Sequence, residues 1–194
     1  MFANLFSSNR SQFLPWLAIV AVLLVTIYQL YRQGRLWICA CGEVFLWSGD
    51  IWSSHNSQHV FDPYTFTHIE HGFLFLWLLL WALPQLAPAW RLWVALSLEA
   101  LWEVLENTNF IIERYREATA SLDYFGDTIL NSVSDILICG LGFVIARHLG
   151  FRRTFVLFIV MEVVLMIWIR DSFILNILML IYPIEAIKTW QLGG

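Results

Sequence analysis

Long apolar runs separated by polar segments dominate the chain. The first run, Phe13–Tyr31, is long enough to cross a bilayer, because a transmembrane helix needs roughly 20 residues. Asp62 followed by Pro63 predicts the start of a second helix, since proline is favoured in the first helical turn. The pattern predicts four helices after the first, which cover Pro63–Leu83, Pro88–Ile112, a segment from after Asp123 to His148, and Arg152–Arg170.

Two segments do not fit simple spanning helices. The segment Arg32–Phe61 is too polar to span but is rich in tryptophan, which is typical of a chain that lies at the membrane interface or caps a bundle. The tail Asp171–Gln191 is either a short sixth span or a broken helix that ends in an amphipathic piece. We therefore predict one all-α integral membrane domain, residues 1–194, with five transmembrane helices, or six if the tail spans.

Composition agrees with membrane residence. The chain is 59% hydrophobic and 13% charged, and its mean hydropathy is +0.67, whereas soluble domains are about half apolar and a quarter charged. Eleven tryptophans fit the aromatic belts of membrane proteins. The net charge of −4 argues against a nucleic-acid partner and leaves membrane lipid as the expected one.

Orientation follows from the distribution of basic residues, which are nearly balanced between the two sides. The short loop between the fourth and fifth predicted helices is the densest, with Arg147, Arg152 and Arg153. Short basic loops stay in the cytoplasm. We therefore expect the N-terminus in the cytoplasm and the tryptophan-rich segment in the periplasm.

Polar side chains form one stripe on each of three predicted helices. Helical spacing places the members of each stripe on one face: His68 and His71; Glu99, Glu103 and Glu106; and Asp127, Asn131 and Asp135. An ionised group at the bilayer centre costs at least about 2.5 kcal/mol. These groups are therefore expected to face one hydrated cavity rather than lipid.

The rise of an α-helix predicts which side chains share a depth. Counted from the predicted helix ends, His71, Glu103 and Asn131 each lie about 12 to 13 Å deep. A shallower layer holds His68, Glu106 and Asp127, and a deeper one holds Glu99 and Asp135.

Imidazoles and carboxylates that converge from several helices are the donors of divalent metal sites. The predicted metal ligands are His68, His71, Glu99 and Glu103. The predicted catalytic residues are Glu103, Asp127, Asn131 and Asp135. The alternative is a buried hydrogen-bond network that fixes helix packing. Arg114 and Arg116 either belong to a solvated charged loop or bind an anionic head group.

Cysteine and histidine also occur in the segment after the first helix. Cys39 and Cys41 form a C-x-C pair without a second pair at zinc-site spacing, which favours a structural or incidental role. His55 and His59 are interpreted as solvated loop residues, since nothing else nearby completes a site. They add ligands only if the loop folds over the mouth of the cavity.

Several strings in the chain resemble one family over nearly its whole length. They are WSGDIWSSHNSQHVFDPYTFTHIEHG, WEVLEN, IERYR, DYFGDTILNSVSD and YPIEAIKTWQ. They resemble an uncharacterised family of bacterial multi-pass inner-membrane proteins, domain-of-unknown-function family 2585. That resemblance implies a bacterial inner-membrane protein and carries no activity. A looser likeness, to VanZ-like membrane proteins, rests on the order of His71, Glu99, Glu103, Arg116, Asp127 and Asn131.

These patterns support three hypotheses. The first is a membrane-embedded enzyme, a hydrolase or transferase acting on a lipid or a lipid-linked substrate, with a divalent metal as the expected cofactor. The second is a small proton- or cation-coupled transporter that uses the same carboxylates. The third is a non-catalytic structural or assembly subunit. A blind cavity favours the enzyme, and a path toward both faces favours the transporter.

Overall fold

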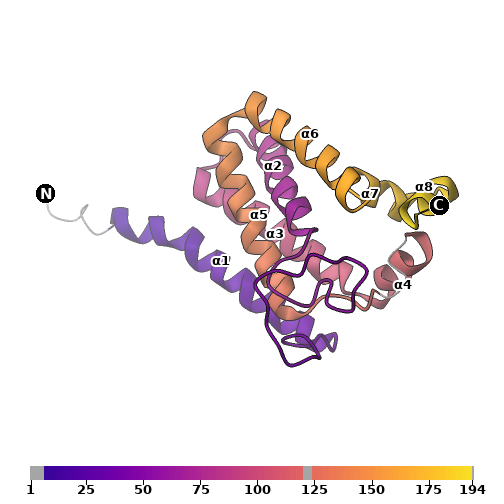
Figure 1. The fold of residues 1–194 in the computed structure, drawn as a ribbon. Coiled ribbons are helices and arrows are strands. Elements are labelled where there is room, and N and C mark those ends of the chain that lie inside the picture. Colours follow the sequence, from indigo (N-terminus) through magenta and orange to yellow (C-terminus); the bar gives the residue numbers. More distant parts are fainter. Residues whose placement is uncertain (1–6, 120–123, 194) are drawn as a thin grey trace, which may run out of the picture.

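A computed structural model describes residues 7–119 and 124–193 of the chain (Figure 1). The regular elements in these ranges are helices, apart from one isolated bridge between Trp47 and Phe61. The helices are α1 (Ser7–Arg32), α2 (Thr65–Ala82), α3 (Pro88–Glu106), α4 (Asn109–Ala118), α5 (Ile129–Leu149), α6 (Phe151–Trp168), α7 (Phe173–Ile181) and α8 (Glu185–Gln191). The all-α prediction is confirmed.

Two of the described helices are long and apolar enough to cross a membrane, Phe13–Arg32 within α1 and the whole of α5. A third span results if α6 and α7, which meet at a bend of 71°, count as one. Helices α2 and α3 form within the regions predicted for them, but acidic residues such as Glu70, Glu99 and Glu103 interrupt their apolar runs. Two or three of the five predicted spans are therefore supported by length and composition.

The predicted third helix is wrong at its C-terminal end. It stops at Glu106 instead of Ile112, and α4 begins after Thr108, whose hydroxyl oxygen accepts the N–H of Ile111. Residues 113–118, expected in a charged loop, belong to α4. A threonine with extended backbone is a good N-cap and starts a new helix axis.

Two other predicted helices begin later than expected. Thr128 caps α5 through the N–H of Asn131, so that helix starts at Ile129, and Asp123 lies outside the described residues. Helix α2 starts at Thr65, and the Asp62 carboxylate accepts the N–H of Tyr64 at 2.7 Å.

Helices α2 and α5 cross at a pair of glycines. A Cβ at Gly72 would lie 2.2 Å from the carbonyl oxygen of Cys139, and one at Gly142 would lie 2.2 Å from that of Ile69. Larger residues would therefore push the two backbones apart, because only small residues let two helix backbones approach this closely. This contact places the N-terminal turns of α2 beside those of α5.

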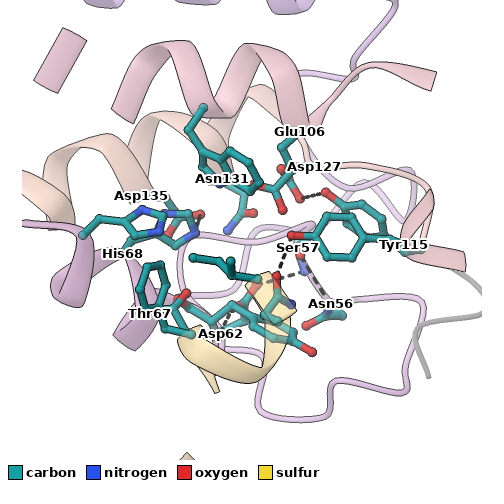
Figure 2. Close-up of a pocket in the computed structure, with 17 residues that line it drawn as sticks. Asn56, Ser57, Asp62, Thr67, His68, Glu106, Tyr115, Asp127, Asn131 and Asp135 are labelled. Atoms are coloured by element: carbon teal, nitrogen blue, oxygen red, sulfur yellow. Dashed lines mark hydrogen bonds and ion pairs between the residues drawn. The ribbon is translucent and has the colours of Figure 1, made fainter. Parts of the chain in front are cut away.

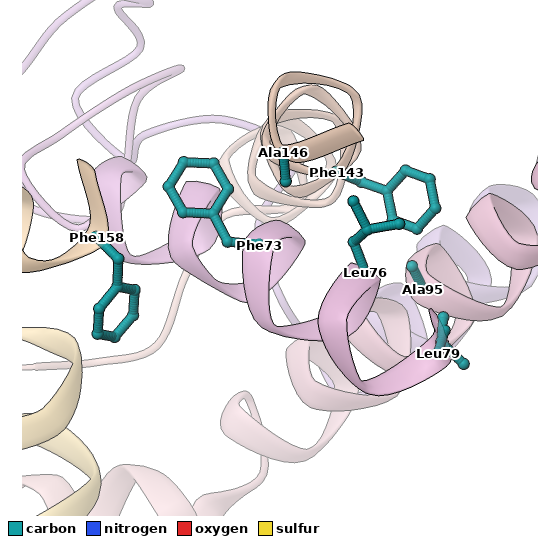
Figure 3. Close-up of a cluster of buried hydrophobic side chains, with 7 residues drawn as sticks. All are labelled: Phe73, Leu76, Leu79, Ala95, Phe143, Ala146 and Phe158. Carbon is teal, nitrogen blue, oxygen red and sulfur yellow. The ribbon is translucent and has the colours of Figure 1, made fainter. Parts of the chain in front are cut away.

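An apolar cluster fills the bundle at the other end of these helices (Figure 3). Its side chains come from α2, α3, α5 and α6: Phe73, Leu76, Leu79, Ala95, Phe143, Ala146 and Phe158. The loop between α1 and α2 lies at the opposite end, at the foot of α5 (Figure 1). The bundle thus has an apolar end and a polar end.

The tail was predicted to be either a short sixth span or a broken helix. The structure shows a broken helix, divided into α7 and α8. Helix α7 docks on α4, where the Tyr115 hydroxyl donates to the side-chain oxygen of Asn176 at 2.7 Å. Glu162, on α6, accepts the N–H groups of Phe173 and Ile174 and so caps the start of α7. The first turns of α7 therefore face the polar end of the bundle.

Candidate functional site

One cavity lies at the polar end of the bundle, between the α1–α2 loop and helices α2, α3, α4, α5 and α7 (Figure 2). Its volume is about 60 Å³, enough for a few water molecules, since one water needs roughly 10 to 15 Å³. The ionisable side chains that line it include four acids and two histidines, Asp62, Glu106, Asp127, Asp135, His68 and His71.

His68 is the centre of the carboxylate cluster. Its Nδ1 lies 2.6 Å from Glu99 Oε1 and 3.5 Å from Glu103 Oε1, and its Nε2 lies 3.9 Å from Asp135 Oδ2. The carboxylates come from α3 and α5, and all four residues are buried. Helices α3 and α5 thus place three acids around one imidazole of α2.

His71 shares the same carboxylate. Its Nδ1 lies 2.8 Å from Glu99 Oε2 and 2.9 Å from Glu99 Oε1. The ring packs edge-on against Phe173, with centroids 4.9 Å apart. Because Glu99 accepts from both imidazoles, it fixes the orientation of both rings.

The other two acids of this cluster have oxygens without a described hydrogen-bond partner. Among the described residues, neither oxygen of Glu103 has a hydrogen-bond partner, and the same holds for Asp135 Oδ1 and Asn131 Nδ2. Buried polar atoms are normally satisfied, and unpaired buried charge is costly. The cluster therefore has the capacity to take up protons, water or a cation.

A second group of acids shares Glu103 with the first. Glu103, Glu106 and Asp127 each offer an oxygen within 4.8 Å of the others. Asp127 is held by the Tyr124 hydroxyl at 2.9 Å and by the Asn107 amide at 2.8 Å, and its own N–H donates to Asn107 Oδ1 at 2.7 Å.

The sequence analysis missed Asn107 and Tyr124. Asn107 follows Glu103 by four residues, so it continues the polar stripe of α3, and this spacing was the available signal. Tyr124 had no periodic signal, because it lies outside the helices, between α4 and α5.

Burial governs the ionisation of the acids outside the helices. It raises the pKa of Asp62 to about 6, although the N–H groups of Tyr64 and Ser57 oppose the shift. Burial also raises the pKa of Asp127, against the hydrogen bonds from Asn107 and Tyr124. In the loop, burial and the neighbouring His55 lower the pKa of His59.

The predicted layers are wrong by about one helical turn. His71 pairs with Glu99 rather than with Glu103, and Glu103 lies beside His68. Because α3 ends at Glu106, six residues early, each of its acids is about 9 Å shallower than predicted. Counted from the observed ends, Glu99 matches His71 in depth and Glu103 matches His68.

Arg114 and Arg116 do not line the cavity. Arg114 donates to the carbonyl oxygens of Leu180 and Ile181 at the end of α7. Arg116 donates to the Tyr124 carbonyl oxygen, and its guanidinium lies 5.0 Å from the ring centroid of Phe125. Head-group binding by these arginines stays a prediction.

The α1–α2 loop holds a separate cluster. Cys39 and Cys41 form a disulfide, Cys39 Sγ lies 3.9 Å from His55 Nδ1, and that nitrogen lies 2.9 Å from His59 Nε2. The interpretation of His59 as solvated is wrong, since 1% of it is exposed. The fold brings the two cysteines close to the two histidines, although the spacing of these residues in the sequence matches no common metal-binding motif.

Comparison with known proteins places the chain in a family. Residues 30–193 match the family described as "Protein of unknown function (DUF2585)". The chain belongs to this family. The resemblance found in the sequence is thereby confirmed, and the likeness to VanZ-like proteins stays a prediction.

Close relatives occur in several bacteria. The chain is 48% identical to a UPF0314 protein of Brucella anthropi, over 91% of this chain and 90% of the relative. It is 49% identical to a UPF0314 protein of Rhizobium etli, over 95% of this chain and 94% of the relative. It is 45% identical to one of Paracoccus denitrificans, over 91% of each. No solved structure matches the chain.

Proposed function

We propose that this chain is a multi-pass protein of the bacterial inner membrane, with α1, α2, α3, α5 and the bent α6–α7 pair crossing the bilayer. The outer faces of α1 and α6 support this, because Leu17, Val25 and Ile167 expose 65%, 67% and 79% of their surface. Hydrocarbon would cover such apolar surface. The short arginine-rich turn between α5 and α6 supports a cytoplasmic N-terminus.

Within that membrane we propose a membrane-embedded hydrolase or transferase acting on a lipid or a lipid-linked substrate. The observation that carries this proposal is the buried set around His68, where Glu99, Glu103 and Asp135 meet one imidazole beside an open cavity. Among the described residues lining the cavity, acids outnumber histidines. A cation or protons would offset the surplus negative charge.

The donor set fits a divalent metal. Two groups of potential ligands share His68, one with His71 and Glu99 and one with Glu103 and Asp135. His68, His71, Glu99 and Glu103 would hold the ion, because imidazole and carboxylate together suit such ions and the Glu103 oxygens have no described hydrogen-bond partner. When bound, a metal of this kind polarises a phosphoryl or carbonyl oxygen and acidifies water. Asn131 and Asp135 line the cavity beside this set, where they would orient substrate and exchange a proton with it.

The shape of the cavity supports an enzyme over a transporter. Its lining comes from one end of the bundle, and the apolar cluster around Phe73 and Phe143 fills the other end. Trp102, Phe173 and Ile177 form an apolar part of the wall, which suits the hydrophobic portion of a lipid. Proton- or cation-coupled transport by the same carboxylates is the alternative, and it requires a second opening.

Metal content and bound lipid test the proposal on purified protein in detergent. We expect one divalent ion per chain in the wild type and a loss of at least about tenfold in metal affinity for Glu103→Gln, which keeps the shape of the side chain but removes the charge. Glu113→Gln is the matched control, because Glu113 lies exposed on α4.

Two results would contradict the enzyme. If wild type and Glu103→Gln had equal ion content and equal thermal stability, Glu103 would not bind an ion. The remaining hypothesis would then be a non-catalytic structural or assembly subunit. Ion flux through wild-type proteoliposomes that Glu103→Gln abolishes would favour the transporter.

A further inference from the structure

The α1–α2 loop gathers four metal-ligand side chains from two places in the chain. Cys39 and Cys41 lie shortly after α1, and His55 and His59 lie shortly before α2. One donor atom of each side chain lies within 4.8 Å of the others. Two thiols and two imidazoles are the donor set of many tetrahedral zinc sites.

The histidine geometry points the donor atoms at one place. His55 Nδ1 and His59 Nε2 are 2.9 Å apart, and the two rings are stacked with an interplanar angle of 18°. Cys39 Sγ approaches the same His55 nitrogen at 3.9 Å. The four donor atoms therefore need only small movements to surround one ion.

Two of the four ligand residues are shielded from solvent. Cys39 is 6% exposed and His59 is 1% exposed. The Phe45 ring lies against both histidines, with centroids 4.5 Å from His59 and 5.9 Å from His55. An apolar wall of this kind limits water access and strengthens ligand–ion contacts. Cys41 is exposed and gives the ion a route of entry.

The oxidation state of the cysteines decides whether the site exists. In the structure Cys39 and Cys41 are joined as a disulfide, and only thiolates are strong ligands. A dithiol reductant transfers two electrons to the disulfide, which leaves two thiols on the protein and a disulfide on the reductant. When the thiols then bind an ion, their two protons pass to the solvent.

We propose that Cys39, Cys41, His55 and His59 form a redox-gated site for one thiophilic, tetrahedral ion of the zinc class. The reduced loop binds the ion, and the disulfide form does not. The site is separate from the carboxylate cluster and does not depend on the function proposed for it.

His59 requires the largest adjustment on ion binding. It coordinates through Nε2, so its Nδ1 carries the proton. The N–H of Phe45 now donates to that Nδ1 at 3.3 Å, and this long hydrogen bond opens when the ring turns toward the ion. His55 has no such conflict, because its Nδ1 already faces the cluster.

Cobalt is the probe, because thiolate coordination of Co²⁺ gives an absorption band that carboxylate coordination lacks. Full-length protein in detergent is reduced, freed of reductant without air, and titrated with Co²⁺. We expect one thiolate-bound Co²⁺ per chain, displaced by one equivalent of Zn²⁺, and no such band in the oxidised protein. Cys41→Ser and His55→Ala should each weaken Co²⁺ binding by at least about tenfold.

Two controls separate this site from the bundle. Cys139→Ser removes the buried thiol near Glu99 and should keep the full band. His148→Ala removes an exposed imidazole at the end of α5 and should also keep it. Circular dichroism confirms that each variant folds.

Three outcomes would overturn the proposal: no thiolate band in reduced wild type, an equal band in oxidised protein, or a band lost in Cys139→Ser but kept in Cys41→Ser.

Discussion

His68 and His71 lie three residues apart on helix α2, whereas His55 and His59 lie four residues apart in the loop that precedes it. The helical pair meets carboxylates from α3 and α5, and the loop pair meets Cys39 and Cys41. Carboxylates suit hard ions and bound water, and thiolates suit zinc-class ions. The two histidine pairs therefore offer different sets of donor atoms to an ion.

The two clusters also differ in what holds them. The α2–α5 contact at Gly72 and Gly142 fixes the helical cluster through the backbone. The loop cluster depends on a disulfide and on packing against Phe45. Damage to the helical cluster should therefore cost stability, while damage to the loop cluster should mainly change its chemistry.

The largest effect is expected from Glu99→Ala. Buried His68 and partly buried His71 then lose the acceptor of an imidazole N–H group. Each loss costs up to about 3 kcal/mol, so the free energy of unfolding should fall by up to about 6 kcal/mol. Thermal unfolding in detergent, followed by circular dichroism, measures this. The exposed-site control Glu113→Ala should change little, and an unchanged Glu99→Ala variant would show that this acid does not hold the cluster together.

A smaller, pH-dependent effect is expected at Asp62, which joins the loop to α2. Folding raises its pKa to about 6, so the folded protein binds this proton more tightly than the unfolded chain. The contribution to stability is present below about pH 4 and is lost as the pH rises to about 6, and it amounts to about 3 kcal/mol at most.

Asp62→Asn should therefore lose less stability than wild type between pH 4 and pH 7. Melting temperatures of the two proteins at both pH values test this, with Asp50→Asn as the control, because Asp50 is an exposed acid of the same loop. Parallel pH profiles for wild type and Asp62→Asn would show that Asp62 ionises freely in the folded protein.

The smallest effect is expected from Cys41→Ser in the oxidised protein. The disulfide joins two cysteines that lie two positions apart in the sequence. For so short a loop, the chain-entropy relation gives a stabilisation of the folded state of about 1.6 kcal/mol. The melting temperature should fall slightly, and Asp50→Asn, at an exposed position of the same loop, serves as the control. A drop as large as that of Glu99→Ala would mean that the loop cluster supports the bundle, and the contrast between the two clusters would fail.

The polar stripes of the candidate site could be predicted from the sequence, because helical periodicity depends only on residues that are near one another in the chain. Glu99 and Glu103 face His68 as their spacing predicts, and Asp135 faces it from α5. The predicted pairing of His71 with Glu103 is wrong because it depended on the exact end of α3, which Asn107 and Thr108 set by capping. Helix ends depend on such single contacts, so depth counted from a predicted end carries an error of a turn or more.

Composition and periodicity were enough to predict that the chain is helical, that its long apolar runs suit a membrane, and that Glu99 and Glu103 lie on the same face of one helix. Composition and periodicity are properties of neighbouring residues, so they need no knowledge of the fold. Tertiary structure alone decided that Glu99 serves both His68 and His71, that Asn107 holds Asp127, and that Cys39 meets His55. These contacts join residues 16 to 31 positions apart, and the packing of helices and the path of the loop, rather than any local spacing, bring such residues together.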